Sequence, residues 1–127
     1  MIDPLDYFPF AKELIYDRNN NEIKNRTAIG RSYYAVYLYA TKEYIQYNNN
    51  DSEIESVISN HQAFIRRLKN DSKRTFQKLG NQLFDLKRDR EKADYRINSS
   101  ISRNNAIKSY FFAIKIKGTI DKAFRNS

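Results

Sequence analysis

At 127 residues the chain is long enough for one shared hydrophobic core but too short for two independent ones, which predicts a single domain over residues 1–127. The absence of cysteine and the single histidine exclude disulfide frameworks and thiolate metal sites, so we expect neither a metal ion nor a cofactor. The formal net charge of +8 is unevenly distributed, −3 over residues 1–58 and +11 over residues 59–127, and this basic half favours a polyanionic partner such as RNA.

The first half of the chain predicts two helices. Only three Gly and two Pro occur, both Pro near the N-terminus, so little interrupts a helix. Asp3-Pro4 has the form of a helix start, and the first helix is predicted to end near Asp17. A long second helix is predicted over residues 22–47, between polar turns at residues 19–21 and 48–50.

The predicted second helix is apolar on nearly all sides, which favours a position in the middle of a bundle. One of its faces carries Ile23, Thr27, Gly30, Tyr34, Leu38, Thr41 and Ile45. Other sides carry Tyr33, Ala35, Val36, Tyr37 and Ala40.

The second half predicts shorter and longer helices in turn. A short helical stretch is predicted from Asp51-Ser52, and the Ser-x-x-Gln form of residues 59–62 predicts a capping box that starts the third main helix. A fourth helix is predicted over residues 73–97, and Ser102 is predicted to cap a fifth that runs almost to the C-terminus. The expected fold is an all-α, up-and-down bundle of four to five helices.

No apolar run approaches the roughly 20 residues that cross a bilayer, and the N-terminal stretch carries acidic residues where a secretion signal carries basic ones. We therefore expect a soluble, cytoplasmic protein without a membrane partner.

Arg90 interrupts the apolar stripe of the predicted fourth helix. The stripe consists of Phe76, Leu79, Leu83, Leu86, Arg90, Ala93 and Ile97. A guanidinium that points inward needs a carboxylate, carbonyl groups, water or a bound phosphate. One interpretation is an i, i+4 ion pair with Asp94 that ends the core or sets a subunit interface. The other is a cleft in which Arg90 holds a phosphate group.

Two motifs connect these residues to a known family. The stretch from Arg31 to Tyr37, Arg-Ser-Tyr-Tyr-Ala-Val-Tyr, resembles the Arg-x-Tyr-Tyr-Ala signature on the second helix of HEPN (higher eukaryotes and prokaryotes nucleotide-binding) proteins. Arg90-x-x-Ala-Asp94-Tyr95 resembles the Arg-x-x-Ala-Asp-Tyr motif of one small prokaryotic HEPN branch, which often has a histidine where this chain has His61. The resemblance covers about residues 8–124.

The resemblance implies a helical bundle, commonly a homodimer, in toxin–antitoxin, abortive-infection or CRISPR-linked defence systems. Active members are metal-independent endoribonucleases in which Arg, then four to six residues, then His promote attack of an RNA 2′-hydroxyl on the adjacent phosphate. No histidine follows Arg90 here. The resemblance therefore implies that Arg90 binds the scissile phosphate, that Asp94 orients Arg90, and that His61 or Tyr95 is the acid–base group. The alternative is an inert module that binds RNA, a nucleotide or a partner such as a nucleotidyltransferase-type antitoxin.

Basic residues surround both ends of the predicted fourth helix. The cluster before it contains Arg66, Arg67, Lys69, Lys73 and Arg74, for which a solvated charged face is a fair alternative. The residues predicted to contact RNA are Arg31, Lys87, Arg88, Lys92, Arg96 and Arg103.

Overall fold

The computed structural model describes residues 2–49 and 52–125, and across them it is all-helical, as predicted. A short 3-10 helix, η1 (Pro4–Asp6), precedes six α-helices: α1 (Tyr7–Ile15), α2 (Glu22–Tyr47), α3 (Ser52–Ile58), α4 (His61–Lys69), α5 (Arg74–Tyr95) and α6 (Arg103–Arg125). The count exceeds the predicted four to five because α3, expected only as a short helical stretch, is a helix of its own.

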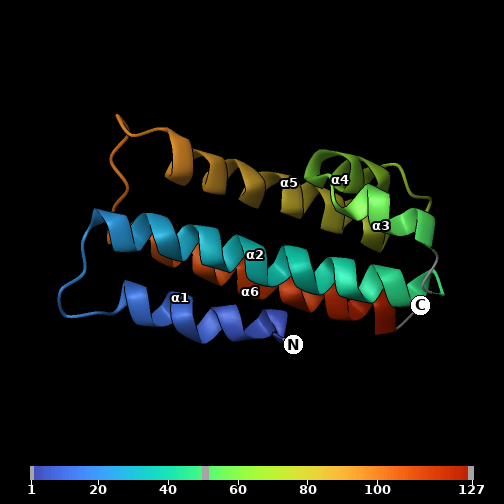
Figure 1. Cartoon of the computed structure of the whole chain (residues 1–127), viewed down its shortest axis with the longest axis horizontal. Helices are drawn as coiled ribbons and strands as arrows, with labels where there is room; N and C mark the ends of the chain where they lie inside the picture. The colour runs from blue at the N-terminus through green and yellow to red at the C-terminus, as the bar shows by residue number, and fades with distance from the viewer. Residues whose placement is uncertain (1, 50–51, 126–127) are drawn as a thin grey trace.

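The helices form an up-and-down bundle (Figure 1). In the figure α1, α2, α5 and α6 lie along the long axis and run in alternating directions, while α3 and α4 lie beside the beginning of α5. Helix α2 contacts η1, α1, α3, α5 and α6. The prediction that the second helix occupies the middle of the bundle is therefore confirmed.

Two clusters of buried side chains hold the bundle together. The larger lies between α2, α4, α5 and α6 and contains the fully buried rings of Tyr33, Phe64 and Phe76. The smaller joins α1 and α2 to the beginning of α6 and includes Ala93 near the end of α5. Burial of these apolar surfaces, at about 25 cal/mol per Å², is the main stabilising contribution to the fold.

Two predicted helix boundaries are wrong, and each has a local cause. Asn60, not Ser59, caps α4, because the Asn60 side chain accepts a hydrogen bond from the Ala63 amide at 3.1 Å. Helix α5 ends at Tyr95 rather than residue 97, so Ile97 leaves the apolar stripe and is 80% exposed.

Most other predicted boundaries are confirmed. The second helix spans residues 22–47 as expected, and Ser102 Oγ accepts a hydrogen bond from the Asn105 amide at the start of α6. The first helix begins as η1 but ends at Ile15, earlier than the predicted end near Asp17. The predicted start at Asp51, and Asn50 of the preceding turn, lie outside the described residues.

None of the helices in residues 2–49 and 52–125 is both long and apolar enough to cross a membrane.

Candidate active site

Three tyrosines of α2 form an aromatic wall, which here means Tyr33, Tyr34 and Tyr37. Tyr33 and Tyr37 lie one helical turn apart and their rings stack with centroids 5.6 Å apart, while the rings of Tyr33 and Tyr34 meet edge to face at 5.6 Å. Tyr33 and Tyr37 are buried and Tyr34 is half-buried. The spacing of these residues therefore places three rings and their hydroxyl groups on one side of α2.

His61, the first residue of α4, lies flat against this wall. Its ring stacks on Tyr37 with centroids 3.8 Å apart and an interplanar angle of 9°, and its Nδ1 lies 2.8 Å from the Tyr33 hydroxyl oxygen. The Tyr37 hydroxyl donates to the carbonyl of Ile58 at the end of α3, which fixes the chain before His61. Nε2 forms no hydrogen bond within the described residues, so it is the ring nitrogen left for proton transfer.

Arg90 of α5 packs on the same aromatic wall. Its side chain is 13% exposed, and its guanidinium carbon lies 5.4 Å from the Tyr33 ring centroid and 5.7 Å from that of Tyr34. Nη1 donates to the Tyr34 hydroxyl and to Asp94 Oδ2, each at 3.3 Å. The ion pair with Asp94 that the spacing predicts is therefore present.

The buried Nε of Arg90 has no hydrogen-bond partner within the described residues. An unpaired buried donor costs about 1–3 kcal/mol, so this arrangement is kept at the expense of stability. Buried charged groups with an unsatisfied donor are concentrated at functional sites, although structural ion pairs also bury charged groups.

Burial and the neighbouring positive charges favour the neutral form of the His61 imidazole. Burial lowers the pKa of His61 below the ordinary value of 6.5, and the positive charges of Arg90 and Lys87 lower it further. Burial also raises the pKa of Tyr33, so its hydroxyl stays protonated. The site thus combines a neutral imidazole with a guanidinium, the states that a general base and an anion ligand require.

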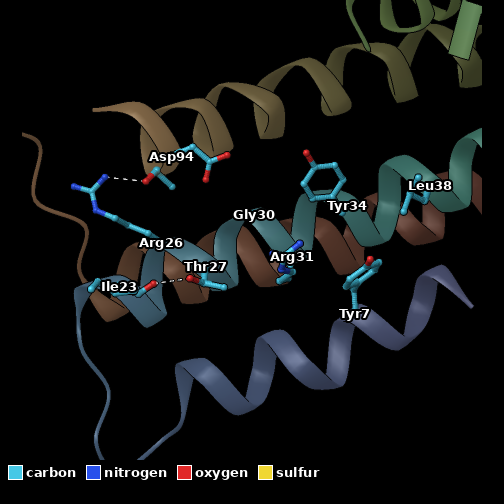
Figure 2. Close-up of a pocket in the computed structure, with 10 residues that line it drawn as sticks. Tyr7, Ile23, Arg26, Thr27, Gly30, Arg31, Tyr34, Leu38 and Asp94 are labelled. Atoms are coloured by element: carbon cyan, nitrogen blue, oxygen red, sulfur yellow. Dashed lines mark hydrogen bonds between the residues drawn. The ribbon is translucent and has the colours of Figure 1, made fainter. Parts of the chain in front are cut away.

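Tyr34 and Asp94, the two partners of Arg90, also line a surface groove of about 600 Å³, which Tyr7, Ile23, Arg26, Thr27, Gly30, Arg31, Leu38 and Ala93 complete. Figure 2 shows this groove over α2, with Tyr7 on α1 and Asp94 on α5 at its sides. The guanidinium carbon of Arg31 lies 6.0 Å from the Tyr7 ring centroid and has no ion pair in the part of the chain described. Arg31 therefore offers an uncompensated charge beside the partners of Arg90.

The groove also changes the interpretation of the predicted apolar face of α2. Ile23 and Leu38 of that face are 75% and 37% exposed and line the groove instead of the core. Ala28, Ile29 and Val36 on other sides of the helix are buried. The groove therefore has apolar edges as well as a cation.

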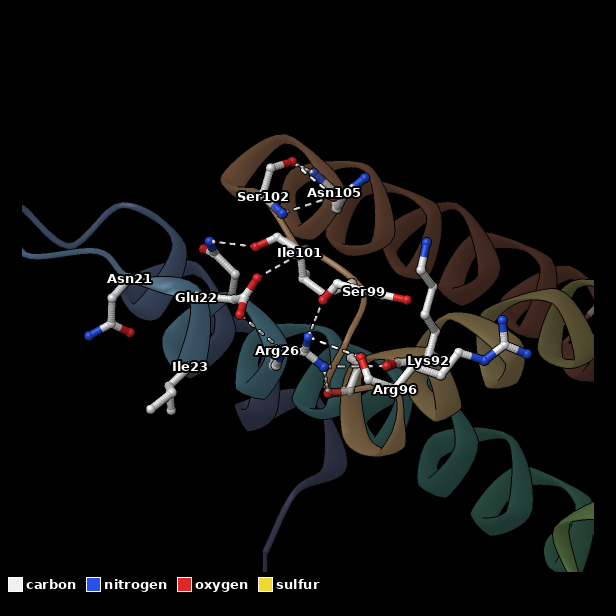
Figure 3. Close-up of polar contacts among 12 residues, drawn as sticks. Asn21, Glu22, Ile23, Arg26, Lys92, Arg96, Ser99, Ile101, Ser102 and Asn105 are labelled. Carbon is white, nitrogen blue, oxygen red and sulfur yellow. Dashed lines mark hydrogen bonds and ion pairs between the residues drawn. The ribbon is translucent and has the colours of Figure 1, made fainter.

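Arg26 fixes the end of α5 that carries Asp94. It donates to the carbonyls of Ala93 at 2.8 Å and Arg96 at 3.1 Å, and also to that of Ser99 (Figure 3). Its Nε lies 3.7 Å from Glu22, whose other oxygen accepts the Ile101 amide at 2.8 Å. Because the last carbonyls of a helix lack partners within it, this side chain satisfies groups that the end of α5 leaves open.

Most of the remaining predicted site residues lie away from this cluster. Tyr95 is 71% exposed and forms no hydrogen bond, ion pair or ring contact with Arg90 or His61. Arg103 donates to the carbonyl of Asp17, at the end of the bundle where α1 ends and α6 begins. Arg88, Lys92 and Arg96 line a separate surface hollow of about 460 Å³ together with Asp85, Asp89 and Glu91. The predicted RNA-contacting set is thus divided among several surfaces, with Lys87 next to His61.

The sequence did not reveal that the tyrosine side chains belong to the site. Tyr33 and Tyr34 belong to the motif that resembles HEPN proteins, yet their contacts with His61 and Arg90 depend on the packing of α4 and α5 against α2. The only sequence signal is the grouping of three tyrosines within five residues, which is equally typical of core. No sequence pattern identified Arg26 as a residue near the site.

The arrangement supplies an anion-binding guanidinium, a neutral imidazole and hydroxyl groups that orient both. Within the described residues no three His, Cys, Asp or Glu side chains gather as metal ligands would. Comparisons of the chain with protein-family models, curated proteins and solved structures give no match.

Proposed function

We propose that this chain is a HEPN-type protein that binds and cleaves RNA without a metal ion, in a toxin–antitoxin or antiviral defence system of the cytoplasm. One observation carries the proposal: Arg90 and His61, far apart in the sequence, contact the same tyrosine, Tyr33. This pairs the arginine that the motif requires with a histidine from another helix.

In the proposed reaction Arg90 binds the scissile phosphodiester and Asp94 holds the guanidinium in place. His61 Nε2 accepts the proton of the RNA 2′-hydroxyl while the 2′-oxygen bonds to phosphorus. The bond from phosphorus to the 5′-oxygen breaks, and the imidazolium returns the proton to that leaving oxygen. The products are a 2′,3′-cyclic phosphate and a 5′-hydroxyl, so atoms and protons balance without a further reactant.

The groove beside Arg90 supports a homodimer as the active form. Its apolar edges at Ile23 and Leu38 are exposed in the single chain, and a second copy would cover them. We also propose a nucleotidyltransferase-type antitoxin as a protein partner. Its gene should neighbour that of this chain, and its co-expression should relieve toxicity.

A second candidate function is an inert module that binds RNA or a partner protein. The limited exposure of Arg90, at 13%, and the hydrogen bond that occupies His61 Nδ1 favour it, because both are also features of a structural polar cluster. The two functions share the fold and differ in whether Arg90 and His61 reach a substrate.

Cleavage assays with end mapping separate the two functions. Purified protein, Arg90→Ala and His61→Ala are incubated with total RNA in EDTA, and a thermal melt of each variant checks its folding. Cyclic-phosphate ends that vanish in both folded variants support the nuclease, and a loss with Arg90→Ala alone removes His61 from the mechanism. Absence of cleavage by folded, partner-free wild-type protein favours the inert module.

A further inference from the structure

A further cavity lies between α4 and α5 and shares no lining residue with the groove. We call it the α4–α5 cleft. Its volume is about 470 Å³, and it is lined by Ile65, Arg66 and Lys69 of α4 and by Phe84 and Lys87 of α5, with Gln62 and Glu91 at the remaining positions. Gln62 follows His61 in the chain, and the charge of Lys87 acts on His61, so the cleft adjoins the candidate active site.

Phe84 gives the cleft an accessible aromatic ring. It lies next to the buried Leu83 in α5 but is itself 39% exposed. Two cations flank its ring: Lys69 Nζ lies 3.8 Å from the ring centroid and the guanidinium carbon of Arg88 lies 5.9 Å from it. An exposed phenylalanine with two cations near its ring differs from the other phenylalanines of α5 and α4, Phe76 and Phe64, which are buried.

Most of the cations at or beside this cleft lack an ion pair in the described residues, although Arg88 also lines the hollow that contains Asp85 and Asp89. Arg66, Lys69 and Arg88 form no ion pair in the described part of the chain, whereas Lys87 pairs with Glu91 at 3.0 Å. Free cations around an aromatic platform are the features by which proteins bind single-stranded nucleic acids: bases stack on the ring and phosphates pair with the cations.

We propose that the α4–α5 cleft binds one nucleotide of single-stranded RNA, with its base stacked on Phe84 and the adjoining phosphates paired with Arg66, Lys69 and Arg88. The Lys69 side chain moves from the ring to a phosphate in this complex, because a stacked base stabilises an exposed ring more than a solvated ammonium does. The strand then continues past Gln62 to His61 and Arg90. The choice of ligand rests on the RNA-directed function proposed above, but binding in the cleft does not require cleavage.

The experiment measures binding of a labelled 2′-O-methyl RNA, which lacks the 2′-hydroxyl needed for cleavage, by fluorescence anisotropy. Phe84→Leu removes the ring but keeps an apolar side chain, and it should weaken binding about tenfold. Phe84→Tyr keeps the ring and should bind within about twofold of wild type. Phe111→Leu is the matched control, because Phe111 is 55% exposed on α6, away from the cleft; it should leave affinity unchanged.

Inorganic polyphosphate separates stacking from charge. Arg66→Gln should weaken both polyphosphate and RNA, and should flatten the dependence of RNA affinity on salt, whereas Phe84→Leu should weaken RNA alone. Equal loss of both ligands in Phe84→Leu would overturn the inference, since it would show that Phe84 acts only by holding the cations.

The outcomes also separate this inference from the proposed function. If the wild type cleaves RNA and Phe84→Leu binds 2′-O-methyl RNA as well as the wild type does, the proposed RNA site in the cleft is rejected and the proposed nuclease activity is kept. Ring-dependent binding without any cleavage supports the cleft and rejects the nuclease. A folded wild type with no affinity for RNA at low salt overturns both.

Discussion

The packing of the His61 ring disfavours its protonation. The stack on Tyr37 and the hydrogen bond with Tyr33 hold the ring in a half-buried place beside Arg90. A proton on this ring would add a second charge next to the guanidinium and remove it from water. The residue is therefore suited to act from its neutral form.

The lowered pKa of His61 predicts how stability depends on pH. Above the ordinary value of 6.5 both the folded and the unfolded chain carry neutral His61, so the shift has no effect. Below it the unfolded chain binds a proton that the folded chain resists, so stability falls as pH drops toward the lower, folded pKa. Urea unfolding at about pH 7.5 and about pH 5 should therefore show a larger loss for wild type than for His61→Gln. Equal losses would contradict this account.

Tyr33 is predicted to orient His61 through its hydroxyl. Tyr33→Phe keeps the ring but removes the hydrogen bond between the Tyr33 hydroxyl and His61 Nδ1, and it should slow the proposed cleavage at least about tenfold while costing about 1 kcal/mol of stability. Tyr16→Phe, at a tyrosine that is 52% exposed on another surface, serves as the control. Cleavage and its pH profile measured for both variants check the prediction; identical profiles would exclude an orienting role.

Among the helices, the close approach of α4 and α5 positions His61 relative to Arg90. Glycine at position 80 allows this close approach, because a Cβ atom there would lie 2.8 Å from the backbone nitrogen of Lys69 and 3.1 Å from the carbonyl oxygen of Ile65. Backbone atoms cannot move aside as a flexible side chain does, so the two helices would have to separate.

Gly80→Ala should therefore destabilise the protein by about 1–3 kcal/mol, although alanine favours helices. Gly118→Ala is the matched control, since a Cβ atom at Gly118 meets nothing within 4 Å on the exposed side of α6. It should stabilise by about 0.5–1 kcal/mol through helix propensity alone. If denaturant unfolding showed a change of the same sign in the free energy of unfolding for both variants, the packing argument would be contradicted.

Arg26 should stabilise the end of α5 by satisfying carbonyl groups rather than by its charge. Arg26→Ala leaves the carbonyls of Ala93, Arg96 and Ser99 without this donor and should cost about 2–3 kcal/mol. The exposed Arg18→Ala should cost less than about 0.5 kcal/mol. Faster hydrogen exchange limited to residues near 93–101 would locate the effect, whereas unchanged exchange there would refute it.

For the whole molecule, the exposed apolar edge of the groove predicts self-association. Leu38→Glu places a charge at the edge of the groove and should convert the proposed homodimer to monomer. Ile114→Glu changes a residue of similar exposure, 40% against 37%, on α6 and should leave the mass unchanged. Sedimentation distinguishes the variants, and a wild type that is already monomeric at high concentration would reject the dimer.

The division of charge predicts salt-sensitive RNA binding by the basic half. Helices α4, α5 and α6 carry most of the cations, while the acidic residues of the first half lie mainly on and between η1, α1, α2 and α3. Affinity for RNA should fall steeply as salt rises, in proportion to the number of phosphates contacted. If the affinity measured by anisotropy did not change with salt concentration, this positive charge would take no part in RNA binding.

The sequence by itself determined the helical class, most helix boundaries and the central position of α2, because these follow from periodicity, polar turns and the scarcity of Gly and Pro. It also identified Arg90 as an inward charge with Asp94 one turn away, since that pair is local to one helix. Only the tertiary structure decided that His61 and Arg90 meet at Tyr33, that Tyr95 and Arg103 stay apart from them, and that Phe84 faces a basic cleft. These relations depend on how α4 and α5 pack against α2, and the periodicity of one helix carries no information about the rotation or offset of its neighbours.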